Sequence, residues 1–208
     1  MYKTKIKISN VNNLTDARYF AAREVDYIGY SMNESDGGIN AIKINAIKEW
    51  VEGPETIIEV GLEELSDLPL LYAKIQPTLI QLPGFVNRGM ANDFFELPIL
   101  KEVVVELPIN EVDILNEISE WNETPIVLDF SRNNISWSEI KEKNLTALIQ
   151  NIVSKNRIWL DLPCENFEWE EILAELNPYG ISIKSSGEEK VGYKSFDEMD
   201  ELLDSLSK

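Results

Sequence analysis

The sequence predicts a single (β/α)8 barrel, and three observations lead to this fold class. Short runs rich in Ile, Val and Leu alternate with segments of helical spacing about eight times along the chain, which is typical of α/β proteins. The runs are largely continuous in apolar residues, as expected for parallel strands covered on both faces. The chain has 208 residues without a linker or low-complexity tract, so we expect one domain over residues 1–208. An open doubly wound sheet is the alternative topology for this pattern.

The individual elements are predicted from the period of their apolar residues. Strands are expected at residues 4–8, 27–30, 56–60, 78–82, 102–107, 126–130, 158–162 and 181–184. Helices are expected at residues 15–24, 41–51, 62–75, 110–121, 136–154, 166–176 and 195–207, with an irregularity at Pro69. Ser136 and Glu139 form a capping-box pattern at the start of one helix. Residues 85–97 have only a weak helical pattern and are predicted as a loop with a short helix.

The composition excludes several classes of function. The formal net charge is −18, which argues against nucleic acid and anionic membrane surfaces as partners because both bind cationic surfaces. The chain has no histidine and one cysteine, so a His-dependent triad, His-ligated zinc and an intramolecular disulfide are excluded. No apolar run reaches membrane-spanning length and no leader pattern is visible, so we expect an acidic, cytoplasmic protein. No metal site or cofactor is predicted.

Segments at both ends of the chain carry more specific motifs. The segment KISNVNNLTDARYFAAREVDYIGY begins at Lys7, and NPYGISIKSSGEEKVGYKSFDEMDELL begins at Asn177. They resemble the two ends of phosphoribosylanthranilate isomerase, the tryptophan-biosynthesis barrel, whose patterns are K-I-C-G-I-T-N-x-E-D-A and P-x-x-V-D-V-S-S-G-V-E. The matching residues are Lys7, Ile8, Asn13, Asp16, Ala17, Asp26, Ile28 and Gly29, then Pro178, Ser185, Ser186, Gly187, Glu189, Gly192 and Lys194. Between them, the segments at 79–84 and 126–129 resemble the family's V-Q-L-H-G and L-L-D.

The resemblance implies a family active site, but several of its residues are replaced. Ser9 stands where the family has the cysteine that acts as general base, and an unassisted hydroxyl is far less acidic than a thiol. Asp129 matches the family's general acid. The arginine expected within residues 31–40 is missing, and Asp161 and Leu162 replace the glycine pair that would approach phosphate. A carboxylate there would repel a phosphate, so we expect that the isomerase activity is lost.

The candidate functional residues lie at the carboxyl ends of the predicted strands, where barrels place their sites. The catalytic candidates are Asp129, Ser9 and Lys7, and the ligand-binding candidates are Gln81, Asp161, Ser185, Ser186 and Gly187. The last three could hold a phosphate on backbone N–H groups, or form an ordinary turn. The carboxylates near these ends could hold a cation or a polyhydroxyl ligand.

Structural rather than catalytic roles are expected for several residues near the strand ends. Lys7 lies on the same face as Ser9 and is expected to form a buried ion pair with Asp129. Glu59 and Glu106 are expected to point outward into solvent. Cys164 is expected to be an ordinary free cysteine rather than a replacement for the missing thiol.

Three functions remain open at this point. We expect a barrel without isomerase activity that binds a small molecule, such as a sugar phosphate, or a protein partner, as a monomer or homodimer. The first alternative is an active isomerase or related sugar-phosphate enzyme with Asp129 as general acid. The second is a different reaction that uses Asp129 with Asp161 or Lys7. A mouth filled by side chains would count against both enzymatic alternatives.

Overall fold

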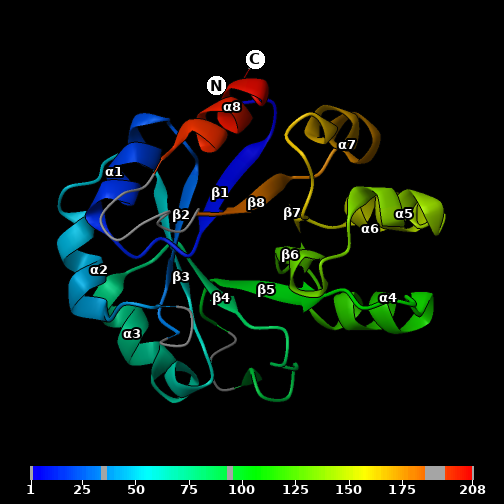
Figure 1. The fold of residues 1–208 in the computed structure, drawn as a ribbon. Helices are drawn as coiled ribbons and strands as arrows, with labels where there is room; N and C mark the ends of the chain where they lie inside the picture. The colour runs from blue at the N-terminus through cyan, green and yellow to red at the C-terminus, as the bar shows by residue number, and fades with distance from the viewer. Residues whose placement is uncertain (1, 34–36, 93–95, 186–194, 208) are drawn as a thin grey trace.

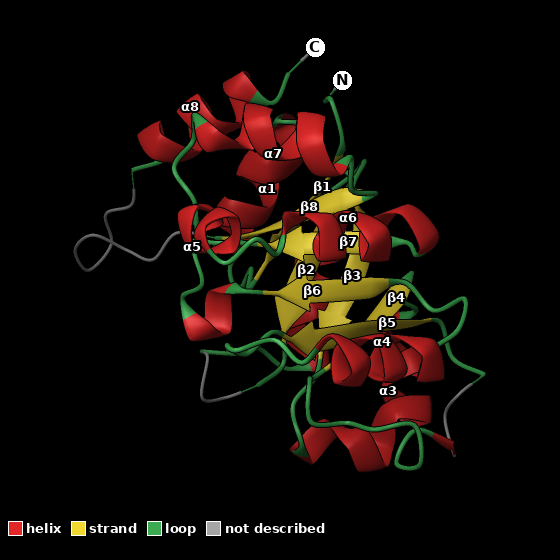
Figure 2. Ribbon diagram, turned by 90° about the vertical axis from the view of Figure 1, so that its right-hand side faces the viewer, coloured by secondary structure: helices red, strands yellow, loops and turns green. Residues whose placement is uncertain are grey.

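The computed structural model confirms the predicted fold class. It describes residues 2–33, 37–92, 96–185 and 195–207. Within these residues, parallel strands close into a barrel in the order β1-β2-β3-β4-β5-β6-β7-β8, because β8 pairs with β1. The strands lie at the centre of Figure 1 with the helices around them, and Figure 2 shows helices packed against the sheet from a second side. Closure of the sheet rules out the doubly wound alternative.

The observed elements follow the predicted order. The strands are β1 (Lys5–Ser9), β2 (Tyr27–Ser31), β3 (Glu55–Glu59), β4 (Leu79–Leu82), β5 (Ile99–Val104), β6 (Ile126–Asp129), β7 (Ile158–Asp161) and β8 (Gly180–Lys184). The α-helices are α1 (Leu14–Ala22), α2 (Ala41–Lys48), α3 (Leu68–Ile75), α4 (Glu111–Glu120), α5 (Trp137–Glu142), α6 (Thr146–Lys155), α7 (Glu168–Leu176) and α8 (Asp197–Ser205). The short 3₁₀ helices η2 (Glu63–Asp67) and η4 (Ser131–Asn133) precede α3 and follow β6.

Side-chain caps fix where several helices begin. The Asn13 side chain accepts a hydrogen bond from a backbone N–H of the first turn of α1 at 2.9 Å, and Asn40 and Asn110 do the same for α2 and α4. Ser136 and Glu139 form the predicted capping box at the start of α5. These local signals explain why most helix starts were predictable within a few residues.

Two predictions about element bounds are wrong. β5 begins at Ile99 and ends at Val104, so Glu106 lies beyond the strand rather than inside it. The segment 136–154 forms two helices because the chain turns at Asn144, which adopts φ 57° and so ends α5. Residues 85–92 form the predicted loop, with a 3₁₀ turn at Asn92, and because 93–95 lie outside the described residues the short helix stays a prediction.

The two faces of the barrel strands have different surroundings. Because side chains alternate along a strand, Ile6 and Ile8 pack outward against the helices while Lys7 and Ser9 point inward. A compact apolar layer fills the middle of the barrel; its members are Ile57, Leu100, Val127 and Trp159. The residues on the carboxyl side of this layer are polar, so the barrel is closed at its centre and polar at its mouth.

Lys101 of β5 is fully buried between the barrel and α4. Its ammonium donates hydrogen bonds to the carbonyl oxygens of Pro83, Gly84 and Glu102 at 3.0, 2.8 and 2.5 Å. It also lies 5.5 Å from the centroid of the Trp121 ring. Burial lowers the pKa of Lys101 to about 8, while nearby carboxylates oppose this shift.

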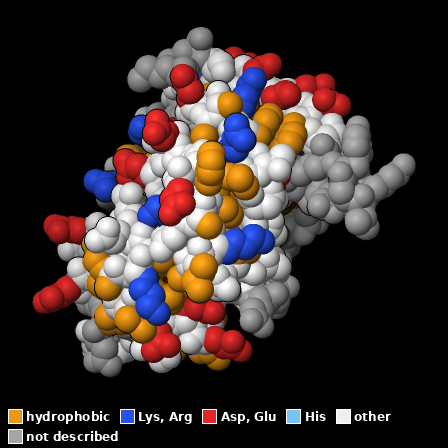
Figure 3. Space-filling model, turned by 90° about the vertical axis from the view of Figure 1, so that its left-hand side faces the viewer, with side chains coloured by type: hydrophobic (Ala, Val, Ile, Leu, Met, Phe, Trp, Pro, Cys, Tyr) orange, Lys and Arg blue, Asp and Glu red, His pale blue; other side chains and the backbone are white. Residues whose placement is uncertain are grey.

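The surface is acidic overall but mixed in detail. Figure 3 shows the face that carries α1, α2 and α3, where Lys and Arg side chains lie among acidic and apolar ones. Exposed apolar side chains of this region include Ile42 and Leu70. Among the described helices, none is long and apolar enough to cross a membrane.

Candidate functional site

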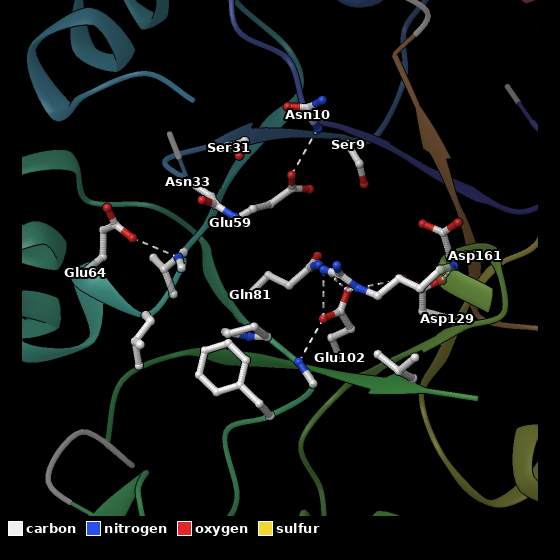
Figure 4. Close-up of a pocket in the computed structure, with 18 of the residues that line it drawn as sticks. Ser9, Asn10, Ser31, Asn33, Glu59, Glu64, Gln81, Glu102, Asp129 and Asp161 are labelled. Carbon is white, nitrogen blue, oxygen red and sulfur yellow. Dashed lines mark hydrogen bonds and ion pairs between the residues drawn. The ribbon is translucent and has the colours of Figure 1, made fainter. Parts of the chain in front are cut away.

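The carboxyl ends of the strands surround a cavity of about 680 Å³ (Figure 4). Each strand contributes one inward-facing polar residue at this end, because the alternation of side chains is in phase around the barrel. In strand order they are Ser9, Ser31, Glu59, Gln81, Glu102, Asp129, Asp161 and Lys184. The mouth is therefore open rather than filled by side chains, so it does not count against the enzymatic alternatives.

One hydrogen-bond network crosses the mouth from β3 through β1 and β8 to β7. The buried ammonium of Lys7 donates to Glu59 Oε1 at 2.6 Å and to Ser9 Oγ at 2.5 Å. Ser9 Oγ lies 2.9 Å from Ser182 Oγ, and Ser182 Oγ donates to Asp161 Oδ2 at 3.2 Å. The predicted ion pair between Lys7 and Asp129 is therefore wrong, because β3 brings Glu59 to the ammonium instead.

Glu59 points into the mouth rather than outward as expected. Its second carboxylate oxygen accepts a hydrogen bond from the Asn10 backbone N–H at 3.0 Å. Gly29 makes room for it, because a Cβ at this position would collide with Glu59 Oε1. A larger residue at this point of β2 would therefore force the Glu59 carboxylate to shift. Glu106, in contrast, is exposed as predicted.

A second network joins β5, β6 and the η4 helix. Arg132 Nη2 lies 2.9 Å from Glu102 Oε1, and Arg132 Nε lies 3.5 Å from Asp129 Oδ2. Asp129 Oδ1 also accepts the backbone N–H of Arg132 at 3.0 Å, and Glu102 Oε2 accepts that of Gly84 at 2.8 Å. Arg132 therefore neutralises two carboxylates of this chain, which weakens it as an anion contact for a ligand.

Burial changes the acidity of the carboxyl groups around the mouth. The pKa of Asp161 is raised by burial and by the charge of Asp129, whereas its hydrogen bond from Ser131 opposes the shift. The pKa of Glu102 is also raised by burial, against the lowering effect of Arg132. Both groups are thus better proton acceptors than exposed carboxylates.

The structure brings together most, but not all, of the predicted site residues. Asp129, Ser9, Gln81 and Asp161 line the cavity, and Lys7 lies directly behind Ser9. Ser185 instead donates a hydrogen bond to Asp16 Oδ2 at 3.1 Å and does not line the cavity.

The remaining predictions about the site have mixed outcomes. Ser186 and Gly187 lie outside the described residues, so their predicted role as a phosphate contact stays a prediction. Cys164 is partly buried, and burial raises the pKa of its thiol, which makes it a poor nucleophile.

Residues of the site that sequence reasoning missed include Glu102, Ser182, Lys184, Asn10 and Ser31. Glu102 was missed because the strand that carries it was placed three residues too late. Ser182 and Lys184 alternate inward along β8, and a period-two count from Gly180 would have found them. Asn10 adopts φ 59°, a left-handed conformation that asparagine tolerates better than most residues.

Within the described residues, no group of carboxylate or thiol side chains is arranged to hold a metal ion. The carboxylates of the mouth are instead occupied by Lys7, Arg132, hydroxyls and backbone N–H groups.

Comparison with solved structures places this geometry in a known fold. No protein-family model matches the chain, and no curated protein matches it. The phosphoribosylanthranilate isomerase of Thermotoga maritima is 18% identical, with a TM-score of 0.77 and 98% of each chain covered. The isomerase of Thermus thermophilus is 22% identical, with a TM-score of 0.74 over 98% of each chain. The chain has the phosphoribosylanthranilate isomerase fold.

Other solved structures show how far this similarity extends. An isomerase in complex with reduced 1-(o-carboxyphenylamino)-1-deoxyribulose 5-phosphate is 19% identical, with a TM-score of 0.75 over 98% of each chain. A 3-hexulose-6-phosphate synthase is 8% identical, with a TM-score of 0.66 over 98% of this chain and 100% of the other. The resemblance predicted from sequence motifs is thus confirmed for the fold, and at these identities the comparison concerns the fold alone.

Proposed function

We propose that this barrel has lost the phosphoribosylanthranilate isomerase reaction and binds a small, uncharged or cationic polar molecule at its mouth. The observation that carries the proposal is the charge of an open cavity: its lining contains six carboxylates, Glu59, Glu63, Glu64, Glu102, Asp129 and Asp161, and two cations, Arg132 and Lys184. Such a lining favours ligands that bring hydrogen-bond donors, such as amines and polyols.

The same charges disfavour the ligand class of the fold's isomerases. The ligand in the complexed isomerase carries a carboxylate and a phosphate. Two like charges 4 Å apart repel by about 1 kcal/mol in water and by about 4 kcal/mol near a protein surface. Asp161 occupies the end of β7, where bare backbone would be needed to approach a phosphate, and Arg132 is already paired with Glu102 and Asp129.

A thermal-shift and calorimetry series tests the proposal. A neutral polyol and an amino sugar should raise the melting temperature, whereas ribose 5-phosphate and inorganic phosphate at equal concentration should not. Glu102→Gln should weaken binding of the amino sugar, and the matched variant Glu106→Gln should bind as the parent does, since Glu106 is exposed outside the cavity. Preferential binding of the phosphates would contradict the proposal.

The loss of activity has its own test. Purified protein should not turn over phosphoribosylanthranilate, and the gene should not rescue a strain that lacks the isomerase. Efficient turnover or rescue would show that the reaction is retained.

A second candidate function is an isomerase with an altered base, and one observation favours it. Ser9 and Asp129 occupy the positions of the family's base and acid, and both line the same cavity. This candidate predicts that Asp129→Asn abolishes turnover and that Ser9→Cys increases it. If both variants behave as the parent does, the candidate fails.

A further inference from the structure

The hydrogen bonds behind Ser9 have a single possible direction. An ammonium group only donates, so Lys7 donates to Ser9 Oγ across 2.5 Å. Ser182 uses its one proton to donate to Asp161 Oδ2 across 3.2 Å. The bond of 2.9 Å between the two hydroxyls must therefore be donated by Ser9. The result is a directed chain, Lys7 to Ser9 to Ser182 to Asp161, in which Ser9 is the hydroxyl nearest the cavity.

The first link of this chain makes Ser9 more acidic than an isolated serine. Lys7 is 0% exposed, so its charge acts on Ser9 Oγ with little screening by solvent. Glu59 lies 2.6 Å from the ammonium and forms an ion pair with it, which holds the Lys7 side chain in place beside Ser9. An alkoxide at Ser9 would thus lie beside a fixed positive charge, which is a recognised way of activating a nucleophile.

The hydrogen-bond series ends at a proton acceptor, Asp161. Asp161 receives the Ser182 proton on Oδ2 and a hydrogen bond from Ser131 on Oδ1, which fixes the carboxylate in place. Ser9 and Asp161 both line the cavity, whereas Lys7 and Ser182 do not. Lys184 is the register partner of Ser9 on β8 and also lines the cavity, which places a second positive charge near Ser9.

We propose that Ser9 is a nucleophile and that the cavity accepts small, uncharged or cationic esters whose acyl group is transferred to Ser9 Oγ. The inference extends the proposed function, because it uses the same cavity and the same class of ligand. The sequence-based objection to Ser9 concerned an unassisted hydroxyl, and here the hydroxyl is assisted from both sides.

The reaction balances without any further reagent except water. Ser9 Oγ bonds to the ester carbonyl carbon while its proton passes to Ser182 Oγ and the Ser182 proton passes to Asp161 Oδ2. The carbon–oxygen bond to the leaving alcohol breaks, and Asp161, which faces the cavity, returns a proton to that alkoxide. Water then attacks the acyl-serine and gives a proton to Asp161, which faces the cavity. As the acyl–oxygen bond breaks, Ser9 Oγ takes the proton of Ser182 and Asp161 returns one to Ser182, which releases the carboxylic acid and restores Ser9.

Diisopropyl fluorophosphate, which is uncharged, tests the nucleophile directly. It should form a bond between phosphorus and Ser9 Oγ with release of fluoride, seen as one adduct by intact mass and mapped to Ser9 by peptide sequencing. Ser9→Ala should give no adduct, and Ser182→Ala should label at least about tenfold more slowly because the proton relay is cut. Ser154→Ala, on the exposed side of α6, is the matched control and should label as the parent does.

A second variant keeps the proposal testable if Ser9→Ala misfolds. Ser9→Cys should be alkylated by iodoacetamide at least about tenfold faster than the native Cys164, because the thiolate would lie beside Lys7. No adduct in the parent, an adduct at another residue, or equal alkylation of the two cysteines would each overturn the proposal. If polyols and amino sugars still raise the melting temperature in that case, the nucleophile fails while the binding function stands.

Discussion

Removal of the Lys7 ammonium should destabilise the fold strongly, and the structure gives the size of the effect. The Lys7 side chain is 0% exposed and the Glu59 side chain 14% exposed, with 2.6 Å between ammonium and carboxylate. Lys7→Met leaves an apolar chain of similar length and a carboxylate without its cation. The net cost therefore comes from the charge that remains rather than from lost packing.

The magnitude follows from how much of Glu59 stays solvated. Breaking a buried ion pair by removing one partner costs about 3–5 kcal/mol. In Lys7→Met, Glu59 still accepts the hydrogen bond from the Asn10 N–H at 3.0 Å and still reaches the cavity. We therefore expect a loss of stability at the lower end of this range, about 3 kcal/mol. The double variant Lys7→Met/Glu59→Gln removes both charges and keeps an acceptor for Asn10. It should lie within about 1 kcal/mol of the parent, because replacement of a whole buried pair is often close to neutral.

Urea unfolding of the parent, both single variants and the double variant forms a double-mutant cycle. The slopes should be equal, so that shifts of the midpoint report stability alone. Lys141→Met, which breaks the exposed contact with Glu171, is the matched control and should move the midpoint little. If Lys7→Met costs less than about 1 kcal/mol, or the two single effects simply add, then the pair is not coupled as the contact distance implies.

Three further predictions concern the fold. The pKa of Lys101 is about 8 in the folded chain and 10.5 in the unfolded chain, so the unfolded chain binds more protons between these pH values. The stability of the parent relative to Lys101→Met should therefore rise with pH over this range by about 3 kcal/mol, measured by urea titrations at several pH values. Gly180→Ala should lower the melting temperature markedly, since the new Cβ would collide with the Trp159 ring, and a gain in stability would refute the packing argument. Ser136→Ala should cost about 1 kcal/mol by calorimetry, because it removes the capping box with Glu139, and an unchanged melting temperature would contradict this role.

The accuracy of the fold prediction had local causes. Each strand is an apolar run, each helix has its own period, and caps such as Asn13 and Ser136 act within one turn of chain. These signals need no knowledge of distant residues. They failed at Asn144, where a single left-handed residue divides a helical pattern, and in β5, where apolar residues continue past the last strand pairing.

The site was less predictable because it depends on the residue at which each strand ends. With β5 placed three residues late, Glu106 was expected at the strand end and Glu102 was overlooked. Glu102 then proved to be the partner of Arg132, so the error in one strand also concealed the role of a loop residue.

The sequence by itself predicted one domain of alternating strands and helices, with a barrel as the favoured topology, and it showed the acidic composition and the serine at position 9. Those properties depend on residue type and on short-range spacing. Only the tertiary structure decided which charge meets which: Lys7 with Glu59, 52 positions apart, and Ser9 with Ser182, 173 positions apart. Such partners depend on the stagger of all the strands around the closed sheet, which no local stretch of sequence encodes.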